Sequence, residues 1–275
     1  MISDEEYKKR IQDLKDKKFK KLYFIHVPKA AGSYVREFPI PTSVHGNHEQ
    51  FHNNSSYSIG RIVDGAMHST RQLLERGDIV TGYSMITKAK NSNISQDSLK
   101  FATVRNPFDY LISCYFSGMV GAPGQTIRCN NDHGSYKTYC EHCNGFGYER
   151  FLSEFSRGRM LYEPCRKNLF HQVFDNEGRC GVDLLIRSEY VAEGLQQLGK
   201  IISLKDEAKN IPKDHANSSS KRMKRDYREF YSPKIKDMVE RKVRNELDMF
   251  GYTFDGPVDK RPFVFLDRDK RYDIF

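Results

Sequence analysis

A short segment near the N-terminus combines the residue types that bind a phosphate-like anion. Lys29 supplies a mobile positive charge and Ser33 a hydroxyl donor. Ala30, Ala31 and Gly32 lie between them and are small, which lets the backbone approach an anion closely. A helix that begins here adds free N–H groups and the positive end of its dipole. The alternative interpretation is an ordinary strand-to-helix turn with a surface lysine.

The order of these residues distinguishes this segment from the common nucleotide-binding phosphate loop. In the pattern GxxxxGK[ST] the lysine follows the last glycine, whereas Lys29 precedes Gly32. The sequence therefore disfavours an ordinary P-loop kinase. A nucleotide kinase with an atypical phosphate loop stays as an alternative function.

A second candidate for anion binding follows the apolar segment 100–104. Arg105 stands where that segment, read as a buried strand, ends, and open α/β sheets bind ligands at such strand ends. Asn106 is a good N-cap and Pro107 suits a first helical position, which predicts a helix over 107–117. Ser113, two turns into that helix, can share an anion with Arg105. Taken alone, Arg105 is better explained by an ion pair with a nearby carboxylate.

The elements that position these residues alternate along the chain. We expect strands at 22–27, 78–82, 100–104 and 183–187. We expect helices at 4–20, 34–38, 66–76, 107–117, 148–174 and 189–198, and a last one from the N-cap Ser232 to a stop at Gly251. This alternation predicts one α/β domain over 1–275, with three layers and a central parallel sheet flanked by helices. Residues 118–147 read as an irregular insertion rich in Gly and Cys.

Together, the two anion-binding segments resemble the PAPS-dependent sulfotransferases. Residues 26–33, HVPKAAGS, resemble the family's 5′-phosphosulfate loop, commonly HIPKTGGTS. Residues 104–113 resemble its 3′-phosphate element. Residues 183–189 and 227–254 are similar to the strand and the C-terminal helix of the carbohydrate, Golgi-type branch. The resemblance spans 21–254.

The chain departs from the family pattern at three positions of the first loop. Ala30 and Ala31 stand where Thr and Gly are usual, and Tyr34 where a small residue is common. These departures affect the expected geometry of the loop and leave the class unchanged.

The resemblance implies transfer of a sulfuryl group from 3′-phosphoadenosine 5′-phosphosulfate (PAPS) to an acceptor hydroxyl, which releases PAP and needs no catalytic metal. The acceptor is expected to be a carbohydrate, and anionic carbohydrates are among the expected acceptors. The loop residues Lys29, Ala30, Ala31, Gly32, Ser33 and Tyr34 would hold the 5′-phosphosulfate, with Lys29 stabilising the leaving phosphate. Arg105 and Ser113 would hold the 3′-phosphate. The variable loops 42–66 and 118–147 are expected to define the acceptor pocket.

Such a reaction needs a general base for the acceptor hydroxyl, and histidine suits neutral pH. The candidates are His45, His48, His52 and His68. His68 ranks first because residues 67–71 resemble a His-Ser/Ala-Thr segment of the family, and His48 ranks second. A solvated or structural role is the alternative for at least three of the four.

The basic segment 218–225 offers two further cations, Lys221 and Arg222. The segment can close over the nucleotide, grip an anionic acceptor, or form a solvated loop. Arg187, at the end of the strand 183–187, is expected to form a structural ion pair rather than to line the site.

The cysteines allow three interpretations. Cys129, His133, Cys140 and Cys143 offer a zinc-like spacing. In an oxidising compartment the same cysteines can instead form disulfides with Cys165 or Cys180, and in a reducing one they stay thiols. Disulfides or thiols are favoured over zinc because a single CxxC is a weak signal. Cys114 is expected to be buried.

Composition bounds these interpretations. The 275 residues carry a formal net charge of +9, which favours an acidic ligand or surface, and 38% are hydrophobic, enough for a folded core. No nucleic-acid-binding motif is visible, so a non-catalytic basic module that binds nucleic acid or glycan is a minor alternative. No run of 18 apolar residues and no apolar leader is present, which predicts a cytoplasmic protein, or a Golgi-lumenal one if the chain is a trimmed piece.

Overall fold

The computed structural model describes chiefly residues 2–17, 98–117, 148–158, 177–201, 225–267 and 269–273, with a few positions between 19 and 35 and between 169 and 174. Contacts divide the chain into two compact units. Unit 1 comprises Met1–Arg105, Phe170–Ala216 and Lys260–Asp273, and unit 2 comprises Asn106–Leu169, Asn217–Asp259 and Ile274–Phe275. The single domain over 1–275 stays a prediction.

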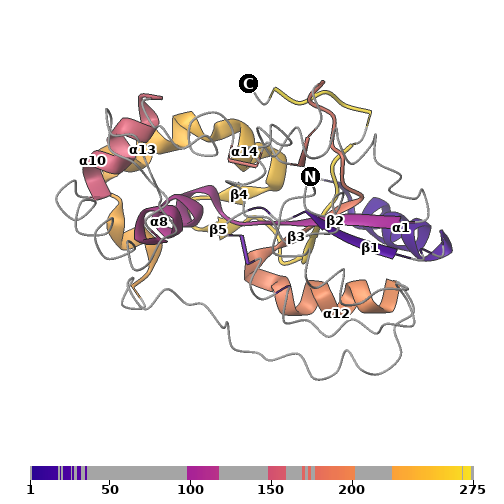
Figure 1. Ribbon diagram of the computed structural model, residues 1–275. Coiled ribbons are helices and arrows are strands. Elements are labelled where there is room, and N and C mark those ends of the chain that lie inside the picture. Colours follow the sequence, from indigo (N-terminus) through magenta and orange to yellow (C-terminus); the bar gives the residue numbers. More distant parts are fainter. Residues whose placement is uncertain are drawn as a thin grey trace, which may run out of the picture. The chain divides into compact units, whose positions relative to one another are not determined.

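Unit 1 is built on a sheet with the strand order β1-β2-β3-β6 (Figure 1). Its strands are β1 (Lys21–Ile25), β2 (Ser98–Val104), β3 (Leu184–Arg187) and β6 (Phe263–Val264). The first three run parallel, which confirms the strands predicted within 22–27, 100–104 and 183–187, while β6 pairs antiparallel with β3 and was not predicted. The predicted strand 78–82 lies outside the described residues.

Apolar side chains from one face of this sheet pack against two helices, α1 (Asp4–Asp16) and α12 (Val191–Ile201). The short 3-10 helix η2 (Ser188–Tyr190) joins β3 to α12. Gly194 lets α12 lie close to β3, because a Cβ there would come within 2.4 Å of the Ile186 Cγ2 atom. The core of this face contains Leu14, Val35, Leu99, Phe101, Leu184, Ile186, Val191, Leu195, Leu198, Ile201, Phe263 and Phe265.

The described part of unit 2 contains helices and a small hairpin. Its elements are α8 (Pro107–Ser117), α10 (Tyr148–Ser156), η5 (Tyr227–Phe230), α13 (Pro233–Lys242), α14 (Arg244–Phe250), β4 (Tyr252–Thr253) and β5 (Gly256–Pro257). The predicted helix 107–117 is confirmed with the same bounds. The hairpin and η5 were not predicted.

Two predicted helices of unit 2 were too long. The helix predicted over 148–174 ends at Ser156, because Gly158 takes the left-handed backbone that stops a helix (φ 70°). The predicted last helix starts at the Ser232 cap and ends at a left-handed Gly251 as expected, but Val243 leaves helical angles and divides it. The division puts Glu246 in the first turn of α14, where a carboxylate is favourable.

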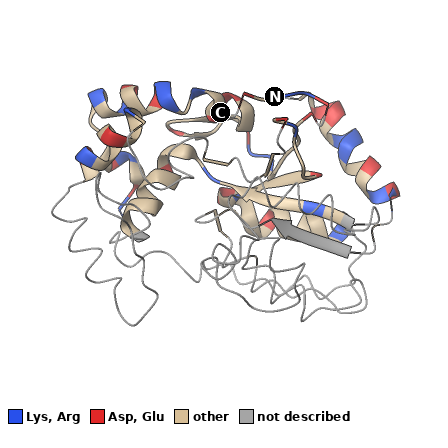
Figure 2. Cartoon of the chain, turned by 45° about the horizontal axis from the view of Figure 1, so that its top comes forward, with Lys and Arg blue, Asp and Glu red and all other residues tan. Residues whose placement is uncertain are grey.

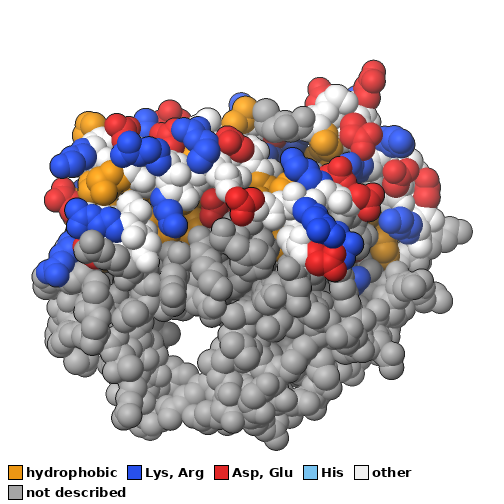
Figure 3. Space-filling model, turned by 90° about the horizontal axis from the view of Figure 1, so that it is seen from above, with side chains coloured by type: hydrophobic (Ala, Val, Ile, Leu, Met, Phe, Trp, Pro, Cys, Tyr) orange, Lys and Arg blue, Asp and Glu red, His pale blue; other side chains and the backbone are white. Residues whose placement is uncertain are grey.

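Charges of both signs occur on α1 and on one face of the described surface. The first turn of α1 is acidic, which complements the positive end of the helix dipole, whereas its last turn carries both Lys15 and the acidic Asp13 and Asp16 (Figure 2). On the face seen in Figure 3, the described Lys and Arg side chains are interspersed with Asp and Glu.

Candidate functional site at the carboxyl edge of the sheet

The two predicted anion-binding segments follow neighbouring strands. Because β1 and β2 are parallel, with Ile25 paired to Ala102, their carboxyl ends meet at one edge of the sheet. The first segment begins after β1 and Arg105 directly follows β2. Two stretches about eighty residues apart in the sequence therefore start side by side within unit 1, as the α/β prediction required.

The described residues after β1 form a tight turn that leads into helix. The Ala30 amide donates to the Val27 carbonyl at 3.3 Å, and the Val35 amide donates to the Ala31 carbonyl at 3.2 Å. The second bond has the four-residue spacing of an α-helix. Val27, Ala30 and Val35 are fully buried and anchor the turn in the core. The strand-loop-helix order predicted here is thus confirmed at these positions.

Ala31 has a left-handed backbone, with φ of 63°. This region suits glycine, and an L-residue with a Cβ pays roughly 1–2 kcal/mol to enter it. The family resemblance puts glycine at this position. The loop therefore keeps the backbone shape that glycine would give it, at a cost in stability, and such strain is typical of ligand-binding loops.

Several predicted site residues lie outside the described residues: Lys29, Gly32, Ser33, Tyr34, His45, His48, His52, His68, Lys221 and Arg222. The same holds for Cys129, His133, Cys140, Cys143 and Cys165. Their roles stay predictions.

The turn after β2 is held by the side chain of Asn106, which is 1% exposed. Its Oδ1 atom accepts from the Phe108 amide at 3.0 Å, which confirms the predicted N-cap. Its Nδ2 group donates to the Thr253 carbonyl at 2.8 Å and to the Tyr227 hydroxyl at 3.3 Å. Arg105, which is half-buried, is bonded directly to this anchored residue.

Ser113 lies in α8 and is only 7% exposed. It belongs to unit 2, whereas Arg105 belongs to unit 1, so a shared anion stays a prediction. The neighbouring Cys114 is fully buried, as expected from the sequence.

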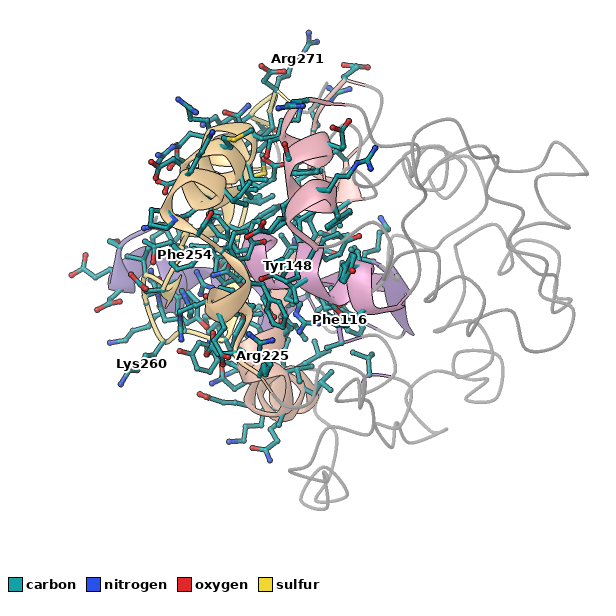
Figure 4. All side chains as sticks on the ribbon, turned by 90° about the vertical axis from the view of Figure 1, so that its left-hand side faces the viewer. Phe116, Tyr148, Arg225, Phe254, Lys260 and Arg271 are labelled. Atoms are coloured by element: carbon teal, nitrogen blue, oxygen red, sulfur yellow. The ribbon has the colours of Figure 1, made fainter. Side chains whose placement is uncertain are left out.

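An aromatic cluster surrounds the hairpin of unit 2. The Phe254 ring, labelled in Figure 4, meets the Phe108 and Tyr231 rings edge-on, at centroid distances of 4.9 and 5.6 Å. The Lys236 ammonium lies 4.8 Å from the centre of the Phe254 ring. The Tyr227 hydroxyl donates to the Phe254 carbonyl, and burial raises the pKa of Tyr227 to about 12. Tyr227 therefore stays a protonated donor at neutral pH.

A model described as the sulfotransferase family matches residues 12–253, which include both anion-binding segments. The chain belongs to the sulfotransferase family. No curated protein and no solved structure matches it.

One cation of the sulfotransferase's basic segment, Arg225, is described. Its guanidinium lies 4.5 Å from the centre of the Phe230 ring, and its Nε group donates to Glu229 at 3.0 Å. Phe230 also contacts Phe116 and Tyr148, which gather near Arg225 in Figure 4. These contacts hold Arg225 on unit 2.

Sequence reasoning missed one contact that holds the end of strand β3 in the sulfotransferase, the hydrogen bond from Arg187 to the Arg261 carbonyl. Arg187 ends β3 and is 2% exposed, so it does not form an open wall of the site. Its Nη1 group donates to the Arg261 carbonyl at 2.5 Å, a contact with a segment to which no structure had been assigned. Its predicted ion pair stays a prediction.

The 3-10 helix η5 was not predicted, although the sequence contains a signal for its start. Asp226 and Glu229 have the spacing of a capping box, and in the structure they form that box.

The described residues of the sulfotransferase bear on three properties, namely metal binding, the state of the cysteines and membrane spanning. Among those residues, no three His, Cys, Asp or Glu side chains gather as metal ligands. The Cys180 sulfur donates to the Val182 carbonyl at 3.5 Å, which is the geometry of a thiol rather than of a disulfide. Within the same residues no helix has the length and apolar character needed to cross a bilayer.

Proposed function

We propose that this sulfotransferase moves the sulfuryl group of PAPS to a hydroxyl of a carbohydrate acceptor. The observation that carries the proposal is the parallel pairing of β1 with β2, which starts the two phosphate-type segments at adjacent strand ends. A bisphosphorylated nucleotide needs two separate anion sites, and the resemblance supplies a role for each. The finer fold that we propose with it is the three-layer, P-loop-like arrangement of that family.

The first site is the loop after β1. The Ala31–Val35 hydrogen bond supports a helical turn there, and amides at the start of a helix lack intrahelical acceptors and favour an anion. We assign the 5′-phosphosulfate to Lys29, Gly32, Ser33 and the backbone around them. Lys29 would stabilise the charge that develops on the leaving phosphate.

The second site follows β2. Arg105 would bind the 3′-phosphate, because a guanidinium matches phosphate oxygens with two parallel hydrogen bonds. Its backbone is bonded to Asn106, which three hydrogen bonds fix in place. Ser113 would add a hydroxyl from α8, and Lys221 and Arg222 would cover the nucleotide.

In the reaction, the acceptor oxygen bonds to sulfur as the bond from sulfur to the phosphate oxygen breaks, which releases PAP. The proton of the acceptor hydroxyl passes to a histidine, for which His68 is the first candidate and His48 the second. The carbohydrate acceptor rests on the resemblance of 183–189 and 227–254 to the carbohydrate branch.

Transfer of label from sulfur-labelled PAPS tests this proposal directly. The unchanged chain is screened against sulfated glycans, simple sugars, phenols and small alcohols, beside K29A, R105A and H68A. Lys9→Ala serves as the matched control, since Lys9 is exposed on α1. We expect transfer to a carbohydrate that K29A and R105A lose and K9A keeps. Label on no acceptor, or Mg²⁺-dependent turnover of ATP instead, contradicts the proposal.

A further inference from the structure

The C-terminal segment Lys260–Asp273 follows the stretch that matches the family, yet it is part of unit 1. Its strand β6 covers the edge of β3, with Phe263 paired to Ile186. The Tyr272 amide donates to the Gly178 carbonyl at 2.9 Å, and Arg10 donates to the Leu266 carbonyl at 3.1 Å. The segment is therefore fastened to the sheet and to α1 along most of its length.

Two arginines make different contacts at the start of this segment. The Arg261 side chain reaches the N-terminus, where Nη1 donates to the Ile2 carbonyl at 3.1 Å and the guanidinium lies 4.9 Å from the centre of the Tyr7 ring. The Arg187 side chain reaches the main chain of the same residue, because its Nη1 group donates to the Arg261 carbonyl at 2.5 Å. The Arg187 amide also donates to the Pro262 carbonyl at 2.9 Å.

The hydrogen bonds of Arg187 to Arg261 and Pro262 lie at the same edge of the sheet as the starts of the two predicted anion-binding segments. Arg187 is the register partner of Val104, the last residue of β2, and Arg105 is the next residue of the chain. Neighbouring strands lie about 4.8 Å apart, so the backbone of Arg187 is one strand away from that of Arg105.

We propose that Arg187, tied to the C-terminal segment, is a positioning residue for donor binding. The tie holds the end of β3, against which β2 ends, and so holds the backbone that carries Arg105. This inference rests on the proposed function, in which Arg105 binds the 3′-phosphate of the donor.

Calorimetric titration with PAP at 15 °C, beside thermal unfolding of each variant, tests the inference. Arg187→Met keeps much of the side-chain volume and loses both the donors and the charge, whereas Arg187→Lys keeps the charge and one donor group. Arg261→Ala is the matched control, since it breaks the contacts with Ile2 and Tyr7 but leaves the main-chain carbonyl that Arg187 uses. Arg105→Ala reports on the proposed 3′-phosphate site itself.

We expect R187M to weaken PAP binding about tenfold, which corresponds to about 1.4 kcal/mol. R187K should stay within about threefold of the unchanged chain, by the same scale. R261A should unfold at a lower temperature and bind PAP with an unchanged Kd. If R187M does not fold, Arg187→Gln takes its place, with the same direction expected.

The outcomes separate the two proposals. PAP affinity that R105A abolishes and R187M, or R187Q in its place, leaves intact overturns the positioning role alone, and Arg187 then only stabilises the fold. An unchanged chain that does not bind PAP, or an R105A variant that binds it equally well, overturns the proposed function and this inference with it.

Discussion

Replacement of Asn106 by alanine probes the turn that precedes α8. The variant loses the N-cap bond to the Phe108 amide, which costs about 1 kcal/mol. It also removes the side-chain donor that lies 2.8 Å from the Thr253 carbonyl, and because Thr253 is exposed this loss should cost about 1 kcal/mol, the net value of an ordinary hydrogen bond. We therefore expect N106A to lower the free energy of unfolding by roughly 2 kcal/mol, and the melting temperature by about 4–8 °C for a chain of this size.

Two matched variants separate the contributions in urea denaturation followed by circular dichroism. Ser232→Ala removes a helix cap and nothing else that is buried, so it should cost about 1 kcal/mol. Asn106→Asp keeps the cap acceptor but replaces the amide donor with an oxygen facing the Thr253 carbonyl, so it should remain well below the unchanged chain at pH 7. An N106A variant no less stable than S232A would refute the reasoning, because the two donor bonds would then contribute nothing.

Three further predictions concern single positions. Ala31→Gly relieves a left-handed alanine and should raise the free energy of unfolding by about 1 kcal/mol in urea titrations; a loss of stability there would contradict the strain. Gly194→Ala puts a methyl 2.4 Å from Ile186 Cγ2 and should cost about 1–3 kcal/mol by overpacking, measured as a lower melting temperature, whereas an unchanged value would show that α12 does not pack this closely. Burial raises the pKa of Glu246 to about 6 from 4.5, so the folded state holds this proton more tightly than the unfolded one. The contribution of Glu246 to stability should thus fall as pH rises from about 4.5 past 6, by up to about 2 kcal/mol, so the unchanged chain should lose stability relative to Glu246→Gln over this range; equal pH profiles of the two would refute it.

The chemistry-bearing segments were accessible to sequence reasoning because their signals are local. A buried strand followed by small residues and a helix start is one continuous pattern, and the Ala30 and Val35 bonds fall where it puts them. Asn106 and Pro107 likewise marked the start of α8 to the residue. The left-handed backbone of Ala31 was not predicted, since alanine itself favours other angles and only the surrounding turn imposes this one.

The C-terminal segment escaped prediction for the opposite reason. A two-residue strand such as β6 has no measurable periodicity, and it forms only because the edge of β3 is there to pair with it. Arg187 was read by residue type, for which a carboxylate partner is usual, and its contact with a carbonyl 74 residues further along the chain had no local signal. Long-range partners of this kind cannot be read from spacing.

The backbone angles of Val243 illustrate a third limit of prediction from sequence. The apolar spacing of the last helix predicts one buried face made of Ile235, Met238, Val239, Val243, Leu247 and Phe250. The last four are buried, whereas Ile235 and Met238 are only half-buried. The spacing did not show that the backbone angles change at Val243, because the buried face continues across the division. Periodicity reports which side of a helix is buried and leaves small breaks along its axis unseen.

The central claim is that the ends of β1 and β2 bind the two anionic ends of one nucleotide. Calorimetry of PAP and of 5′-AMP, which lacks the 3′-phosphate, tests it most directly in the unchanged chain and in R105A. Two charge-assisted hydrogen bonds to that phosphate should give the unchanged chain a preference for PAP of about 100-fold or more, and R105A should lose most of it. Equal affinity of the unchanged chain for PAP and 5′-AMP would contradict the claim.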